Sequence, residues 1–284
     1  MTPGYEFALV AMLCLGLADL AYKRGAAAGV QAHQFLMVQA WCFTPGVVLF
    51  GLVTGTLEPG IPMLWGMAAG LFAFVALYNF ARSLMLGSVS LVAPIFRLSF
   101  TVTAVLAVLI LGEPMTGYRL VGLVLALAAV WLLLGADTGA LPKTAAARRS
   151  LAQAVIAMVA MGVANFVYKV GAQTGGSPAS FLAGQAATFL PLATAFSWRA
   201  DRALRTTRAA WVHAGTAAAL FLVALVMLFE SLARGEASVL VPISQMGFVV
   251  TAVVGLTILG EPFTLRKVAG LAFALAALGC LAKG

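Results

Sequence analysis

The sequence predicts an all-α integral membrane protein of ten transmembrane helices, arranged as two five-helix repeats of inverted topology. Three observations support this prediction. Hydrophobic residues make up 63% of the 284-residue chain and charged residues 9%, and the mean hydropathy is +1.05. Ten apolar stretches are long enough to cross a bilayer, and the second half of the chain repeats the first. A soluble core does not need this much apolar surface.

A membrane-crossing helix takes roughly 20 apolar residues at about 1.5 Å each. Backbone groups in lipid must be satisfied within the segment, so each stretch is predicted to be a helix. The first stretch follows no Lys or Arg and precedes no small-residue cleavage pattern, so we expect a span and not a signal peptide. The predicted spans are 5–22, 34–54, 62–86, 89–111, 117–135, 151–171, 178–197, 210–233, 237–259 and 265–282.

The repeat is visible by direct comparison of the two halves. Residues 88–130 recur as 236–278 with 20 of 43 positions identical, including Ile-Leu-Gly-Glu-Pro at 110–114 and 258–262. Residues 16–26 recur as 162–172. Phe35, Gln39, Phe43 and Pro45 recur as Phe181, Gln185, Phe189 and Pro191. An odd number of helices in each half makes the second half enter the membrane from the opposite side, which is typical of secondary transporters. We therefore expect repeats over 1–140 and 151–284, with a cytoplasmic linker at 141–150.

The basic residues predict the orientation, because cytoplasmic loops carry an excess of Lys and Arg. One side carries twelve of them: Lys23, Arg24, Arg82, Lys143, Arg148, Arg149, Arg199, Arg202, Arg205, Arg208, Arg266 and Lys267. The side of both termini carries only Arg119, Lys169, Arg234 and Lys283. The termini are therefore predicted to be periplasmic. The net charge of +8 is spread over short loops, which favours contact with an anionic leaflet over nucleic acid.

Glycine, glutamate and proline mark the helix ends. Gly112-Glu113-Pro114 and Gly260-Glu261-Pro262 predict tight helix hairpins, with each glutamate facing the start of the following helix. A proton-coupling role for these glutamates is the alternative. Small residues at helical spacing, such as Gly66 with Gly70, predict close helix packing. Prolines that match between the halves predict bends or a broken helix near a site, and the hinge candidates are Pro45, Pro94, Pro191 and Pro242.

Polar residues inside the spans are the main candidates for function. Arg97 and Asp19 fall at similar depth from the same face, so an ion pair forms if their helices touch. Their counterparts, Gln245 and Asn165, are neutral. Two interpretations stay open. In the structural one, the pair stabilises one conformation. In the functional one, Arg97 binds a substrate carboxylate or Asp19 titrates during transport.

Further residues of the same helices complete the predicted polar and aromatic site: Tyr22, Trp41, Tyr78, Asn79, Phe96, Tyr168 and Ser244. Tyr22-Lys23 and Tyr168-Lys169 also fit interface anchors, with each lysine reaching outward to water. Glu230 precedes Arg234 by four residues and predicts a local helix pair. The three cysteines lie in apolar stretches and indicate neither a disulfide nor a metal site.

Ten spans, two five-helix halves and a Leu-Gly-Glu-Pro hairpin after the fourth span of each half resemble the EamA family of the drug/metabolite transporter superfamily. The resemblance implies a central cavity lined mainly by the first, third and fourth helices of each half, and export of small metabolites from the bacterial cytoplasm. Within this family the chain looks most like exporters of aromatic amino acids. Some members are described with cytoplasmic termini, whereas the Lys and Arg count of this chain places them outside.

We therefore expect a secondary exporter of amino acids in the bacterial inner membrane, working by alternating access without a cofactor or metal. A broad drug exporter or an importer of another solute shares these features. The sequence contains no catalytic set, which argues against an enzyme. One duplicated chain encloses a cavity by itself, so a channel built from several subunits is disfavoured and a monomer is expected. The predicted partners are a small-molecule substrate and the lipid bilayer.

Overall fold

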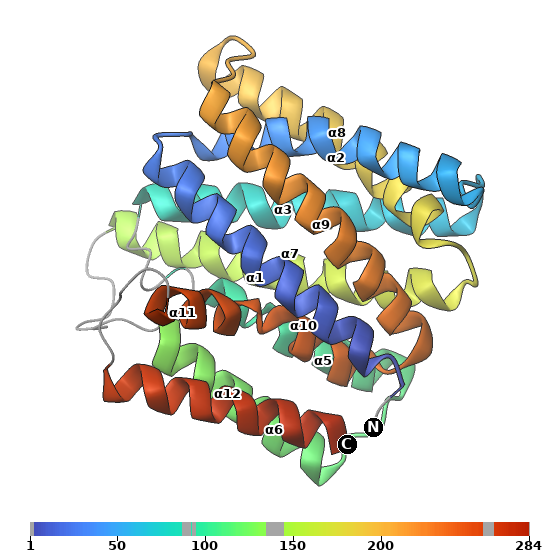
Figure 1. Ribbon diagram of the computed structural model, residues 1–284, viewed down its shortest axis with the longest axis vertical. Coiled ribbons are helices and arrows are strands. Elements are labelled where there is room, and N and C mark those ends of the chain that lie inside the picture. Colours follow the sequence, from blue (N-terminus) through green and yellow to red (C-terminus); the bar gives the residue numbers. More distant parts are fainter. Residues whose placement is uncertain (1–2, 87–91, 93–94, 135–144, 258–263, 284) are drawn as a thin grey trace.

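The protein forms a bundle of helices (Figure 1). The structure is a computed structural model that describes residues 3–86, 92, 95–134, 145–257 and 264–283, and these residues contain no strand. The helices of the first half are α1 (Tyr5–Ala27), α2 (Ala32–Thr54), α3 (Ile61–Leu86), α5 (Ser99–Leu111) and α6 (Gly117–Leu134). Those of the second half are α7 (Ala145–Gln173), α8 (Pro178–Asp201), α9 (Arg208–Arg234), α10 (Ala237–Gln245), α11 (Gly247–Thr257) and α12 (Leu265–Lys283).

The described helices agree with ten membrane-crossing segments. Eight are long and apolar enough to span a bilayer by themselves, counting α10 and α11 together as Ala237–Val254. Two shorter apolar segments, Ile95–Leu111 and Gly117–Leu133, take the places of the fourth and fifth predicted spans. The prediction of a multi-pass all-α protein is therefore confirmed.

The ninth segment is not one continuous helix. It breaks at Met246, between α10 and α11, four residues after Pro242. A proline inside a helix leaves the carbonyl four residues earlier, here that of Ser238, without its donor, so Pro242 weakens the turn that precedes it within α10. In the fourth segment the helix is interrupted at Leu98, the position that matches Met246 in the repeat. The break therefore follows directly after Arg97 in one half and after Gln245 in the other.

The helices of the two halves are interleaved. Helix α1 packs along α9, and α3 packs along α7, which is the same pairing with the halves exchanged. The matching helices α2 and α8 contact each other, and so do α6 and α12, which lie together at the other edge of the bundle (Figure 1). Since most helix contacts join one half to the other, the space between the halves is the natural place for a site.

Glycines allow the closest of these contacts. A Cβ atom on Gly66 would lie 1.9 Å from the carbonyl oxygen of Phe181, and one on Gly70 would lie 2.5 Å from that of Gln185. From the opposite helix, a Cβ on Gly184 would lie 2.0 Å from the carbonyl oxygen of Met63. Helices α3 and α8 thus touch through their backbones, as the spacing of Gly66 and Gly70 predicted.

Helix α7 begins earlier than the sequence predicted. We expected a linker to residue 150 and a span from 151, but the helix starts at Ala145. Its buried Ser150 donates a hydrogen bond to the backbone carbonyl of Ser83 at 2.8 Å. This contact with α3 stabilises the first turns of α7, which carry the two charged residues Arg148 and Arg149 and therefore did not resemble a span.

Candidate functional site

A cavity of about 280 Å³ lies between the two halves of the chain. Its walls come from α1, α2, α3, α7, α8, α9 and α10, together with the helical residues just before α5. Most of the lining is apolar, and aromatic rings make a large part of it: Phe43, Phe80, Phe96, Phe189 and Phe221. The polar lining side chains are Asp19, Tyr22, Gln39, Thr44, Arg97, Asn165, Tyr168, Gln185 and Gln245.

An ion pair between Asp19 and Arg97 carries the charge of this cavity. The Arg97 guanidinium donates a hydrogen bond to the Asp19 carboxylate. The side chain of Asp19 keeps 28% of its surface accessible and that of Arg97 keeps 19%, so both reach the cavity. The sequence predicted that the two residues lie at similar depth and form an ion pair if their helices touch, and the structure shows this contact. The charges cancel, so the cavity holds one cation and one anion without a net charge.

The neutral counterparts of this pair line the same cavity. Asn165 is 4% exposed, and its amide nitrogen is buried without a hydrogen-bond partner among the described residues. Gln245 is the last residue of α10, directly before the break at Met246. A buried amide without a partner is costly, and cavity water or ligand usually satisfies such a group. The charged pair of the first half and the matching amides of the second half therefore line one cavity.

Two tyrosine–glutamine pairs repeat the same contact in the two halves. The Tyr22 hydroxyl donates to the side-chain oxygen of Gln39, and the Tyr168 hydroxyl donates to that of Gln185. All four residues line the cavity. Sequence analysis did not include the glutamines among its candidates. The available signal was that Gln39 and Gln185 are matching polar residues in two otherwise apolar spans.

Four predicted site residues do not line this cavity. Asn79 donates to the carbonyl of Val75 in its own helix, and the buried Ser244 donates to that of Val241. Tyr78 packs against Phe196 and accepts a hydrogen bond from Arg82. The indole of Trp41 donates to the Thr194 hydroxyl at 2.9 Å, beside a separate groove. Counting residues along the spans predicted the depth of these four residues but not the helix face on which they lie, since these spans are apolar on every side.

The hinge candidates occupy different settings. Pro45 lies inside α2 and Pro191 inside α8, and both helices continue through their prolines. Pro242 lies inside α10, just before the break in the ninth segment. Pro94 falls outside the described residues.

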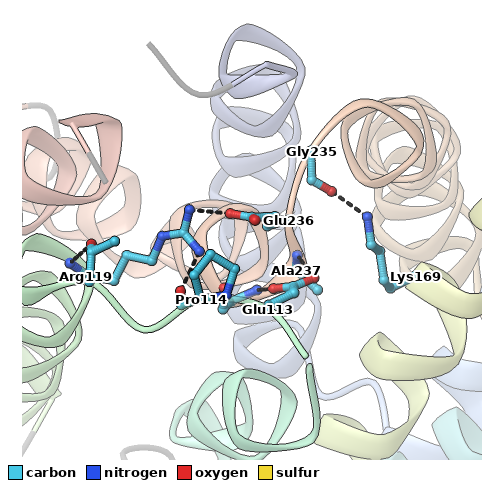
Figure 2. A network of polar contacts seen from close by, with 9 residues as sticks. Glu113, Pro114, Arg119, Lys169, Gly235, Glu236 and Ala237 are labelled. Carbon is cyan, nitrogen blue, oxygen red and sulfur yellow. Dashed lines mark hydrogen bonds and ion pairs between the residues drawn. The ribbon is translucent and has the colours of Figure 1, made fainter. Parts of the chain in front are cut away.

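A network of charged side chains lies where α9 ends and α10 begins (Figure 2). The Glu113 carboxylate accepts hydrogen bonds from the backbone N–H groups of Ala237 and Ser238, both at 2.8 Å. These are orphan donors of the first turn of α10, and a carboxylate there also meets the positive end of the helix dipole. The expectation that Glu113 faces the following helix, α6, was wrong. Gly112 adopts a left-handed conformation with φ of 67°, and the chain turns so that Glu113 caps a helix of the other half.

Lysine and arginine complete this network. The Lys169 ammonium is buried and donates to the carbonyl of Leu232 at 2.9 Å and to that of Gly235, at the C-terminal end of α9. Arg119 pairs with Glu236 and donates to the carbonyl of Pro114. The prediction that Lys169 reaches outward to water was therefore wrong, because unpaired helix carbonyls lie within its reach. Its neighbour Tyr168 lines the cavity, so helix α7 contributes both to this charged network and to the cavity.

One further local prediction is confirmed, since Glu230 and Arg234 form the expected pair between positions four residues apart. The three cysteines are free. Lys23, in the position that matches Lys169, is exposed.

Comparison with known proteins assigns this architecture. The model of the EamA-like transporter family matches residues 2–135 and 148–282. The chain belongs to the EamA-like transporter family. The two matched regions coincide with the two halves of the internal repeat. EamA-like proteins belong to the drug/metabolite transporter superfamily, whose members are transporters, so this chain is a multi-pass membrane transporter of small molecules.

Structural comparison supports the same fold. Among solved structures 29 chains match. One of them, described only as a crystal structure of a protein, superimposes with a TM-score of 0.81 over 98% of this chain and 95% of its own, at 15% sequence identity. This likeness concerns the fold alone. No curated protein sequence matches the EamA-like chain.

Proposed function

We propose that this EamA-like protein is a secondary transporter that exports amino acids, including aromatic ones, by alternating access. The observation that carries the proposal is the Asp19–Arg97 pair in the wall of a neutral, ring-lined cavity. The sequence resemblance to the aromatic amino acid exporter YddG supports the same substrate class.

An α-amino acid matches the charges of the cavity. Its carboxylate takes the place of Asp19 at the Arg97 guanidinium, and its ammonium group takes the place of Arg97 at the Asp19 carboxylate. Each charge of the protein then keeps a partner, which avoids the large cost of an unpaired charge in a low-dielectric site. Both side chains of the pair are partly exposed and line the cavity, so a bound amino acid can reach them. A substrate with a single charge would leave either Asp19 or Arg97 unpaired.

The remaining surface of the cavity favours a small apolar side chain. The rings of Phe43, Phe189 and Phe221 come from three different helices. A volume of about 280 Å³ is at the lower end of the roughly 300–1,000 Å³ of ligand pockets, which favours a single small metabolite over a bulky drug. The amides of Asn165 and Gln245 are available for the polar atoms of the substrate.

The proposed mechanism uses the relation between the halves. We infer inverted repeats because each half contributes five membrane segments and because the helix contacts are reproduced when the halves are exchanged. In the described conformation the Glu113 contact ties the start of α10 to the turn between α5 and α6, and the Lys169 contact ties the end of α9 to α7. We propose that Pro45, Pro94, Pro191 and Pro242 let half-helices bend around the cavity during the exchange.

The proposed location is the bacterial inner membrane, with both termini in the periplasm. Exposed arginines at the end of α8 and in the following loop support this orientation. A variant in which Cys14, Cys42 and Cys280 are replaced by serine and Arg205 by cysteine tests it in intact cells. The cysteine reacts with a membrane-impermeant maleimide only after lysis if the orientation is correct. Labelling before lysis contradicts the orientation but leaves the substrate proposal untouched.

Counterflow in proteoliposomes tests the function. Vesicles loaded with unlabelled L-phenylalanine are diluted into labelled L-phenylalanine, with and without a pH gradient. We expect saturable accumulation of label that phenylalanine inhibits more strongly than 3-phenylpropionate or phenethylamine, which each lack one of the two charges. Equal inhibition by all three compounds contradicts the zwitterion proposal, and flux without counterflow contradicts a carrier.

A further inference from the structure

A second hollow lies on the outer surface of the bundle, between α2 and α8. These helices lie side by side at one edge (Figure 1). The groove has a volume of about 670 Å³ and is lined by residues that include Trp41, Pro45, Pro191, Ala195 and Trp198. The indole N–H of Trp41 is already bonded to Thr194, so the ring presents an apolar face. The groove is thus an apolar hollow that is separate from the transport cavity.

The length of the groove matches one leaflet of a bilayer. It extends from Pro191, in the middle of α8, to Leu204, just beyond the end of that helix. The ten helical steps from Pro191 to Asp201 rise roughly 15 Å, which is half of a hydrocarbon core about 30 Å thick. Trp198 is half exposed near the outer end of the groove, at the level where tryptophan meets lipid headgroups.

Positive charge surrounds the outer end of the groove. Arg199, Arg202 and Arg205 flank Leu204 in sequence and are all exposed. The acidic residue among them, Asp201, is held by Gln34 and His33 of α2. The charge that remains beside the groove is therefore positive, and it suits a phosphate group at the membrane surface.

We propose that this groove binds one anionic phospholipid, with an acyl chain between α2 and α8 and its phosphate against Arg202 and Arg205. The lipid belongs to the leaflet on the side of these arginines. Thr44 and Leu190 line both the groove and the transport cavity, so the bound chain is separated from the substrate by one layer of side chains. The lipid site thereby contacts the wall of the cavity at the α2–α8 seam.

Quenching of tryptophan fluorescence by brominated lipid tests the proposal on the full chain in nanodiscs. A variant with Trp65, Trp131 and Trp211 replaced by phenylalanine keeps Trp41 and Trp198, which both line the groove. Nanodiscs contain either brominated phosphatidylglycerol in a phosphatidylcholine background or brominated phosphatidylcholine at the same mole fraction. We expect phosphatidylglycerol to bind about tenfold more tightly, because basic residues at a membrane surface attract anionic lipid.

Matched charge variants assign the effect to the groove. Arg202→Gln with Arg205→Gln should abolish the preference for phosphatidylglycerol. Arg148→Gln with Arg149→Gln removes the same charge from exposed positions at the start of α7 and should preserve it. Equal quenching by the two lipids overturns the proposal, and so does an absence of quenching by both, which is expected if a second copy of the chain covers the groove. If the tryptophan variant does not fold, retention of phosphatidylglycerol by the wild-type chain and the two charge variants in native mass spectrometry gives the same decision.

Discussion

Replacing Glu113 with glutamine is the most direct test of the network of charged side chains at the start of α10. The carboxylate accepts two backbone N–H groups at the start of α10, each at 2.8 Å. Glutamine has one carbonyl oxygen, so one of the two N–H groups would face an amide donor. A hydrogen bond to a charged group contributes about 1.5–3 kcal/mol, and loss of an N-terminal cap costs about 0.5–2 kcal/mol. We therefore expect Glu113→Gln to lower the free energy of unfolding by about 2–3 kcal/mol.

Unfolding in detergent, followed by tryptophan fluorescence, measures this difference. The matched control is Glu230→Gln, which removes a carboxylate from the neighbouring helix α9. Glu230 pairs with the half-exposed Arg234, and an exposed pair four residues apart contributes only about 0.3–0.5 kcal/mol. Glu113→Gln should unfold well before this control. Equal midpoints of unfolding for the two variants would refute the account of Glu113 as a cap that joins the halves.

Three further predictions concern the cavity and its supports. Tyr168→Phe leaves Gln185 without its hydrogen-bond donor, and Tyr22→Phe does the same to Gln39. Each variant should bind phenylalanine several-fold more weakly at unchanged expression. Binding assays that show no change in either variant would remove these pairs from the site. Gly66→Ala places a methyl group 1.9 Å from the Phe181 carbonyl oxygen and should strongly reduce the yield of folded protein. The control Gly279→Ala meets no atom within 4 Å and should leave the yield unchanged. Equal size-exclusion profiles for the two variants would contradict the tight α3–α8 contact. Pro242→Ala restores a helix hydrogen bond before the break at Met246. The variant should exchange substrate across the membrane more slowly than the wild type, with the same substrate preference. An unaltered rate of substrate exchange would exclude Pro242 as a hinge.

The sequence predicted the number of segments because hydrophobic length is a strong and simple signal. It also predicted that Asp19 and Arg97 lie at similar depth, since depth in the membrane follows from counting residues along two apolar helices, but it left open whether they pair, as they do in the structure. Gly66 and Gly70 were likewise recognised as packing residues, because only small side chains allow such close contact.

The remainder depended on which helix face meets which neighbour. The spans are apolar all round, so periodicity could not show that Asn79 and Ser244 turn back to their own helices. Glu113 and Lys169 were assigned to local roles because their partners lie 124 and 63 residues away along the chain. A cap or a carbonyl contact from a distant helix leaves no local pattern in the sequence.

Counterflow of labelled L-phenylalanine by the Arg97→Gln variant tests the central claim, that the Asp19–Arg97 cavity binds the transported amino acid. The control is Arg82→Gln, which removes an exposed arginine bonded to Tyr78 outside the cavity. Both proteins should be reconstituted at equal amounts and compared with the wild type. The account predicts saturable counterflow that survives Arg82→Gln and falls at least tenfold in Arg97→Gln, since a charged hydrogen bond of this kind contributes about 1.5–3 kcal/mol. Undiminished counterflow by Arg97→Gln would contradict it.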